Sequence, residues 1–215
     1  MKYVLSVTLL LFTMLGVGYA QEAKSAAELK NEGNAALKSK DYKSALVAFE
    51  SAIANWDEAE DMDAAMVYNT ATCARKIDNH KKALKYYQQS KDLGYKEDVA
   101  AFYIGMAYKN MGKDQEMEKA LLSGIEEFPN SKYIGYMKKE LAKFYVIQAN
   151  EFFTKGISIL NSRVDGNRDQ WDAIKKNAKA EFDQAEALAD KALKYHANNK
   201  PATTIKTKIA ELMKS

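Results

Sequence analysis

The sequence of 215 residues holds little cysteine, proline or histidine, and it has no recognisable catalytic motif. Cys73 is the only cysteine, so no disulfide can form within one chain. The two prolines, Pro129 and Pro201, fall where helices are expected to end or begin, and abundant Ala, Lys and Leu favour an all-α fold. Gly-rich phosphate loops, nucleophile elbows and His-Glu-x-x-His patterns are absent, so the sequence does not predict an enzyme.

The charged residues nearly balance, with a formal net charge of +3. This balance does not indicate a basic stripe, and nucleic acid is therefore not an expected partner. His80 and His196 are the only imidazoles, and both fall in or near expected turns, which favours packing over catalysis or metal binding. We expect no cofactor and no metal.

Residues 1–20 have the layout of a secretory signal peptide. A short basic start precedes an apolar run over residues 3–17, and Gly18-Tyr19-Ala20 supplies small residues before Gln21. An uncleaved anchor is the alternative, but the run is shorter than the roughly 20 residues of a spanning helix. No cysteine follows the cleavage point, so a lipoprotein anchor is not indicated. The sequence predicts a periplasmic or otherwise exported protein without an integral membrane span once the signal is removed.

One spacing recurs along the chain. Gly33 and Ala45 lie twelve residues apart, as do Ala71 and Ala83, and again Gly105 and Met117. Each pair falls in a pattern of helix, short turn and second helix, and successive units are shifted by 38 and then 34 residues. A period near 34 built from such units is typical of a stacked α-solenoid. We expect units at about 26–59, 64–97 and 98–131, with the small residues of each pair facing one another.

The fourth unit departs from the period. Its two helices, expected at 133–161 and 169–196, are separated by a strong turn signal that contains Asp165-Gly166. We expect a long hairpin within an elongated unit at 133–197, and a capping helix at 202–214 after Pro201. One solenoid domain would then span 21–215.

The stretch from Gly33 to Leu46, Gly-Asn-Ala-Ala-Leu-Lys-Ser-Lys-Asp-Tyr-Lys-Ser-Ala-Leu, resembles the tetratricopeptide repeat consensus. The resemblance extends over most of residues 26–131. With its expected signal peptide, the chain is similar to exported bacterial members of the family. It implies an α-solenoid whose first helices line a concave groove, and a non-enzymatic role in protein–protein interaction. A scaffold in the bacterial envelope that binds a peptide or protein in this groove is the function that follows.

Helical spacing assigns residues to that groove. These residues include lysine and arginine as well as amide and apolar side chains. A groove with this lining is suited to bind an extended or helical peptide that carries acidic groups. The alternative interpretation is an ordinary polar helix surface. The groove residues are Ala27, Lys30, Asn34, Lys38, Tyr68, Asn69, Thr72, Arg75, Lys76, Phe102, Tyr103, Met106, Lys109, Asn110, Val146, Asn150 and Phe153.

Some family members clamp the C-terminal carboxylates of chaperones with Lys and Asn side chains. Lys30, Asn34 and Asn69 match that motif, whereas Val99 and Tyr103 stand where it has Lys and Arg. The clamp is half present, and without the guanidinium fork it lacks its strongest bidentate contact.

Two acidic clusters resemble calcium sites only superficially. Asp57, Glu58, Glu60, Asp61 and Asp63 precede a helix start, where negative charge favours the helix dipole. Asp165, Asn167 and Asp169 alternate like an EF-hand loop, but its required Gly and closing Glu are Gln170 and Lys176. Neither cluster predicts a metal site.

A structural or assembly role is the alternative function. The hairpin at 133–196 would then mediate self-association or dock to an envelope complex, and homo-oligomerisation stays open. Exposure of its large apolar side chains would favour this role, and their packing within the hairpin would weaken it. Those side chains are Phe153, Ile157, Ile159, Leu160 and Trp171.

Overall fold

The computed structural model describes residues 24–162 and 168–214. The expected signal peptide and the Asp165-Gly166 turn lie outside these ranges. Within them the regular structure is helical, with nine helices and no strand. The helices are α1 (Ala26–Lys38), α2 (Tyr42–Ala54), α3 (Ala64–Lys76), α4 (His80–Asp92), α5 (Glu97–Asn110), α6 (Asp114–Glu127), α7 (Ile134–Asn161), α8 (Arg168–Tyr195) and α9 (Lys200–Leu212).

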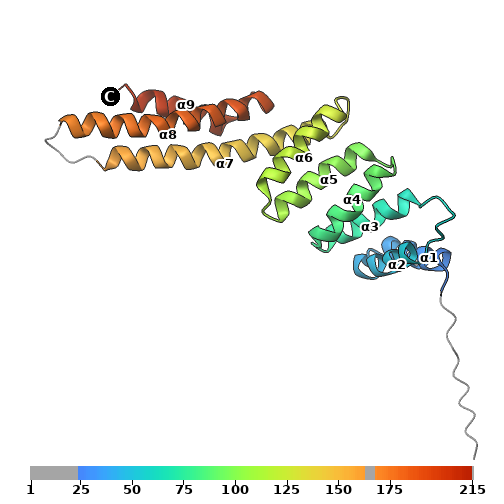
Figure 1. The fold of residues 1–215 in the computed structure, drawn as a ribbon. Coiled ribbons are helices and arrows are strands. Elements are labelled where there is room, and N and C mark those ends of the chain that lie inside the picture. The colour runs from blue at the N-terminus through green and yellow to red at the C-terminus, as the bar shows by residue number, and fades with distance from the viewer. Residues whose placement is uncertain (1–23, 163–167, 215) are drawn as a thin grey trace, which may run out of the picture.

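The helices stack in sequence order into an elongated array (Figure 1). Short antiparallel pairs, α1 with α2, α3 with α4 and α5 with α6, form its first half. The helices α7 and α8 have 28 residues each, about 42 Å at 1.5 Å per residue, and lie side by side as a long hairpin against which α9 packs. The expected all-α solenoid with an elongated fourth hairpin is confirmed.

The turn inside each short pair repeats the same backbone geometry. Lys40, Asp78 and Gly112 adopt positive φ angles of 64°, 56° and 69°, and they are 38 and 34 residues apart, which is the spacing of the sequence repeat. After the first two turns, the side chains of Asp41 and Asn79 cap the next helix, accepting from the backbone N–H groups of Ser44 and Lys82. Local turn chemistry therefore marks the centre of each unit.

In the first and third units, a glycine on one helix leaves room for a bulky side chain of the other, which lets the two helices pack closely. A Cβ added to Gly33 would lie 2.5 Å from the ring of Phe49, and one added to Gly105 would lie 2.4 Å from Leu121. The hairpin repeats the arrangement, with Gly156 against the ring of Phe182. The three atoms nearest to a Cβ at Gly33 all belong to the ring of Phe49 and not to Ala45, so the glycine makes room for this ring.

The buried core forms two clusters that meet at α5, one running from α2 to α5 and the other from α5 to α9. Cys73 lies in the first cluster, where burial raises the pKa of its thiol to about 11. In the hairpin, Phe153, Ile157, Ile159 and Leu160 are half-buried and pack against the second cluster. That packing weakens the argument for assembly through an exposed hairpin.

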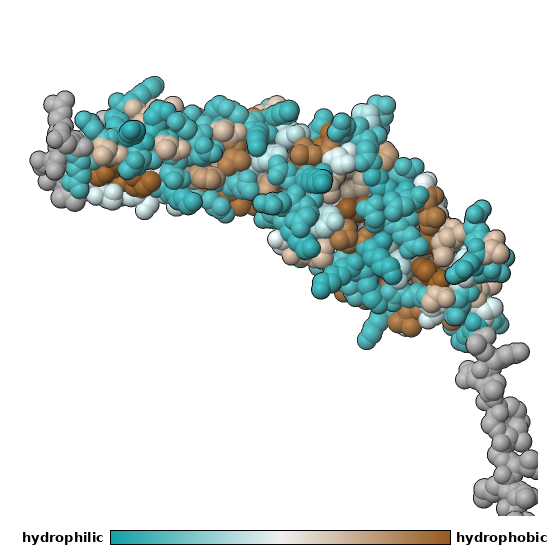
Figure 2. Space-filling view, in the orientation of Figure 1, coloured by the Kyte–Doolittle hydropathy of each residue, from teal (hydrophilic) through white to brown (hydrophobic). Residues whose placement is uncertain are grey.

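The visible surface is largely hydrophilic, with small apolar patches over the stacked repeats and along the long hairpin (Figure 2). Among the described residues, no helix combines the length and apolar character that crossing a membrane requires.

Candidate functional site

Arg75, in the last turn of α3, stands at the centre of the candidate site. Its Nε donates a hydrogen bond to the hydroxyl of Tyr87 at 3.1 Å, and that hydroxyl lies 3.3 Å from the Oγ1 of Thr72. The guanidinium carbon lies 4.4 Å from the centre of the Tyr103 ring on α5. The guanidinium is thus held in one orientation, and its two terminal NH₂ groups have no hydrogen-bond partner among the described residues.

Aromatic rings continue from this centre across three helix pairs. The rings of Tyr87 and Tyr103 stack at 5.1 Å, and the ring of Tyr68 meets Tyr87 edge-on at 5.6 Å. Phe102 lies between Tyr103 at 5.2 Å and Tyr133 at 5.6 Å. We call this surface the tyrosine face. It comprises Tyr68, Tyr87, Tyr95, Phe102, Tyr103, Tyr133 and Tyr136.

Unpaired cations accompany these rings. The Nζ of Lys96 lies 4.5 Å from the centre of the Tyr68 ring, and that of Lys132 lies 5.7 Å from the centre of Tyr133. None of Arg75, Lys96 and Lys132 has a carboxylate within ion-pair distance among residues 24–162 and 168–214. The nearby acid Asp98 is instead held by the hydroxyl of Ser131 at 2.6 Å. A half-buried guanidinium usually has an anionic partner, so the tyrosine face is suited to bind an anionic group of another molecule.

The protonation states favour binding over proton transfer. Burial alone would lower the pKa of Arg75, but the hydrogen bond to Tyr87 and the neighbouring phenols raise it, so the guanidinium stays charged. Burial raises the pKa of Tyr68, of Tyr87 and of Tyr133, and their phenols stay neutral. A general acid or base needs a pKa near the working pH, and none of these groups moves toward it.

The predicted groove residues divide into three sets, and the first is brought together. Tyr68, Thr72, Arg75 and Phe102 all lie on or against the tyrosine face, joined by Tyr103. On the same helices, Asn69 and Met106 are half-buried, and on α1 Asn34 and Lys38 are exposed.

The second set is engaged in ion pairs. The Nζ of Lys30 lies 2.5 Å from the Oδ2 of Asp63, which also caps α3. The Nζ of Lys109 lies 2.5 Å from the Oε2 of Glu140 on α7. Each lysine is therefore paired with a carboxylate of the following repeat unit, either from the N-cap of α3 or from α7. The half-present clamp is weakened further, because its one lysine has an internal partner.

The third set, Asn150 and Phe153, lies apart from the tyrosine face. These residues line a hollow of about 690 Å³ between α7 and α9, together with Pro201 and Ile205. We call the recess between these two helices the α7–α9 groove.

Sequence reasoning missed four of the seven residues of the tyrosine face, namely Tyr87, Tyr95, Tyr133 and Tyr136. Tyr87 belongs to a second helix, so its recurrence suggested packing alone, although its hydroxyl orients Arg75. Tyr95 and Lys96 lie in the turn before α5, and Tyr133 is the N-cap of α7, where no helical period applies. The cluster of aromatic and basic residues at Tyr95-Lys96 and Lys132-Tyr133 was the available signal.

In the described parts of the chain, no group of three His, Cys, Asp or Glu side chains is arranged to hold a metal ion. In the acidic connector before α3, two carboxylates instead accept hydrogen bonds from backbone N–H groups. Asp63 accepts from the N–H of Met66 at 2.9 Å, and Asp57 accepts from the N–H of Ala59 at 2.9 Å. The EF-hand-like alternation begins at Asp165, outside the described residues.

Comparison with known proteins finds a family match in one part of the chain and a shared fold over most of it. The tetratricopeptide repeat model matches residues 99–131, which contain α5 and α6. A solved structure of a TPR repeats protein from Bacteroides fragilis covers 87% of this chain and 99% of its own at a TM-score of 0.57 and 20% identity. Residues 99–131 are thus a tetratricopeptide repeat, and the helical array has the fold of a solved tetratricopeptide repeat protein. The structure of a proposed protein-binding protein from Bacteroides ovatus, at a TM-score of 0.53 and 14% identity, covers 89% of this chain and 98% of its own.

At these identities the two structures show a shared fold. The Protein STIP1 homolog of Dictyostelium discoideum is 28% identical over 121 residues, which is 54% of this chain and 20% of that protein. The chain therefore spans about a fifth of the length of this curated relative. Tetratricopeptide repeat proteins mediate protein–protein interaction. In this chain the tyrosine face places the unpaired charge of Arg75 among rings that are mostly half-buried.

Proposed function

We propose that this protein is a non-enzymatic binding module and that its tyrosine face holds a peptide segment of a partner protein. The single observation that carries the proposal is Arg75, a half-buried guanidinium fixed by Tyr87 and Tyr103 without a carboxylate partner among the described residues. A carboxylate of the partner would accept from its free NH₂ groups in the bidentate geometry that guanidinium favours.

The rings around Arg75 fit the same partner. Tyr136 is 61% exposed, and the hydroxyls of Tyr68, Tyr103 and Tyr133 make no hydrogen bond to a described residue. Tyrosine supplies a large contact area at low conformational cost, and tyrosine with arginine is enriched at energetic centres of interfaces. We therefore propose a peptide with at least one acidic group flanked by apolar or aromatic side chains.

The alternative role in assembly has less support. Phe153, Ile157, Ile159 and Leu160, whose exposure would favour self-association, instead pack against the second core cluster. Catalysis has little support at this face, because the pKa values of Tyr68, Tyr87 and Tyr133 and that of Arg75 are all raised, away from the range of a general acid or base. Binding of a protein partner is the function that these groups serve best.

We also propose that the protein works outside the cytoplasm, in the bacterial envelope, after removal of residues 1–20. The basic start, apolar run and small residues before Gln21 support this location. Cell fractionation with N-terminal sequencing of the mature protein tests it. A mature chain that begins at Gln21 in the periplasmic fraction is the expected result, and a full-length chain in the cytoplasmic fraction would contradict it.

Site-specific photocross-linking tests the binding role. A benzoylphenylalanine introduced in place of Tyr136 should capture a partner protein in cells, whereas the same group in place of Val47 should not. Val47 is a matched control, since it is 59% exposed and lies on α2, away from the tyrosine face. Equal capture at the two positions would contradict a binding site at the tyrosine face.

A further inference from the structure

We infer that the α7–α9 groove is a second docking site and that its occupant is an acidic amphipathic helix of a partner protein. The groove consists of two connected hollows of about 690 Å³ and 490 Å³. Both are lined by Val146 and Ile147 of α7 and by Lys200 and Pro201 of α9. The inference does not rest on the function proposed for the tyrosine face, because Arg75 lies on a different helix.

The floor of the groove is apolar and open to solvent. Ile147 is 62% exposed, an unusual position for a large aliphatic side chain in the middle of a helix. Beside it, Val146 and Phe153 are half-buried, and Ile205 of α9 is buried at the base. A contiguous exposed apolar recess with a polar rim is typical of an interaction site.

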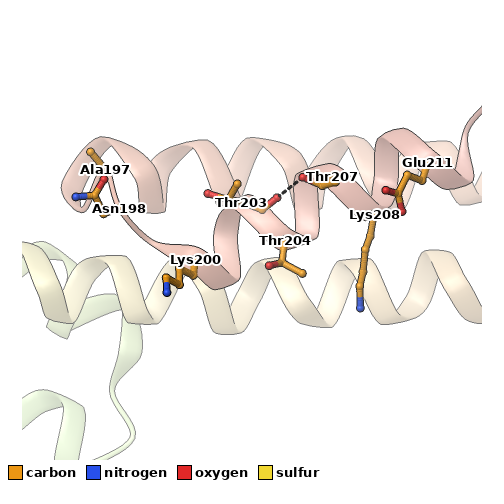
Figure 3. Close-up of a pocket in the computed structure, with 8 residues that line it drawn as sticks. All are labelled: Ala197, Asn198, Lys200, Thr203, Thr204, Thr207, Lys208 and Glu211. Carbon is orange, nitrogen blue, oxygen red and sulfur yellow. Dashed lines mark hydrogen bonds between the residues drawn. The ribbon is translucent and has the colours of Figure 1, made fainter.

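Lysines form the rim on both sides. Lys139 and Lys143 stand on the α7 side, and Lys200 and Lys208 stand on the α9 side. Figure 3 shows Lys200, Thr204 and Lys208 along one side of α9, pointing toward α7. Among the described residues only Lys143 of these four has an ion-pair partner.

The rim therefore favours an acidic occupant. Lys143 is paired with Glu140, and the remaining three lysines stay free of carboxylates in the described parts of the chain. Glu151 is the acidic residue that lines the groove. Positive charge exceeds negative charge along the recess, and an acidic partner would be attracted and oriented by it.

The shape favours a helix. The α7 side of the groove runs from Lys139 to Phe153, about 21 Å of helix, which matches an occupant of about 14 residues. A helix of that length with apolar residues at i, i+3 or i+4, and i+7 would seat them on Ile147 and Ile205 and direct its glutamates to both rims. A membrane is a less suitable occupant, because the apolar side chains lie in a recess between two helices instead of protruding from a flat face.

Fluorescence anisotropy with a defined probe tests the inference. The probe is a labelled peptide of about 14 residues with leucines at helical spacing and glutamates elsewhere. Binding should weaken about tenfold or more with Ile147→Asp, which places a charge on the groove floor, and stay unchanged with the matched variant Val47→Asp. The double variant Lys200→Gln/Lys208→Gln should weaken binding and reduce its salt dependence, whereas Lys38→Gln/Lys43→Gln should do neither. Circular dichroism of each variant establishes that it is folded.

Four results would overturn the inference. They are no binding of the probe, equal binding of a scrambled peptide of the same composition, equal binding of a lysine version, and unchanged binding by Ile147→Asp. Binding to phosphatidylglycerol vesicles but not to the peptide would point to a membrane instead, and a dimer mass in light scattering that Ile147→Asp abolishes would point to a second copy. Arg75→Gln should leave peptide binding in this groove intact, so its outcome is separate from that of the tyrosine face.

Discussion

The guanidinium of Arg75 lies over the ring of Tyr103, with its carbon 4.4 Å from the ring centre, and this contact joins two repeats. Arg75 belongs to α3 and Tyr103 to α5, the first helices of consecutive units. The hydroxyl of Tyr87, from the helix between them, accepts a hydrogen bond from the Nε of Arg75. The candidate site therefore exists only where the units are stacked, and no single repeat contains it.

The first prediction concerns the contact between Gly33 and Phe49. Gly33→Ala should lower the free energy of unfolding by about 1–2 kcal/mol, because overpacking against the ring outweighs the gain of about 1 kcal/mol in helix propensity. Gly135→Ala is the matched control, since no atom lies within 4 Å of its added Cβ, and it should be neutral or slightly stabilising. Urea unfolding measures both. Equal effects of the two substitutions would rule out the proposed role of the glycine.

The second prediction concerns the turn at Lys40, whose φ of 64° is costly for a residue with a Cβ. Lys40→Gly should raise the free energy of unfolding by about 0.5–1 kcal/mol, because glycine adopts this conformation without strain. Lys119→Gly, at an exposed position within α6, should instead lower it by about 1 kcal/mol. Thermal or urea unfolding distinguishes the two signs, and destabilisation by Lys40→Gly would show that the turn is unstrained.

The third prediction is a pH dependence at Asp63. Partial burial alone would raise the pKa of this carboxyl, but the hydrogen bonds from Lys30 and from the backbone of Met66 hold it below its ordinary value. Its contribution to stability is therefore present above about pH 4, the ordinary aspartate range, and is lost as the pH falls through the lower folded value.

Asp63→Asn keeps a helix cap but removes the charge that pairs with Lys30. At neutral pH it should lower the free energy of unfolding by less than about 1 kcal/mol, because Lys30 is over a third exposed and solvent screens the pair. In acid the two proteins should become equally stable. A difference that persists unchanged into acid would show that the charge on Asp63 has no stabilising role.

The fourth prediction concerns Cys73. Its burial and its pKa of about 11 leave the thiol protonated and shielded at neutral pH. Labelling with a thiol reagent should be slow in buffer and rapid in urea, with a single site labelled since this is the only cysteine. Rapid labelling of the folded protein would place Cys73 at an accessible position.

Much of the fold could be predicted from the sequence because its determinants are local. The twelve-residue spacing from Gly33 to Ala45 reflects two helices joined by a fixed turn, and the cap at Asp41 lies within that turn. The extension of the fourth unit followed from the added length between the same two signals. The partner of Gly33 could not be chosen by spacing, since Ala45 and Phe49 lie on the same face of α2, one turn apart.

The site was harder to predict, because its decisive contacts join residues distant in sequence. The sequence does not reveal that Lys30 pairs with Asp63 or that Lys109 pairs with Glu140, because the partners are about 30 residues apart. Arg75 was chosen by helical spacing, but its orientation depends on Tyr87, whose position on a second helix suggested packing only. Charge balance across repeats is a tertiary property, and a repeat pattern does not reveal it.

The measurement that tests the central claim most directly is selection of binding peptides from a random display library, with the purified protein and its Arg75→Gln variant as parallel targets. The account predicts that peptides enriched on the unmodified protein carry an Asp or Glu, and that they bind the variant about tenfold more weakly, the size of one charge-assisted hydrogen-bonded contact. Lys38→Gln, which removes an exposed charge from α1, should bind them normally. Peptides without acidic residues, or with equal affinity for Arg75→Gln, would contradict the assignment of the tyrosine face as the site of partner recognition.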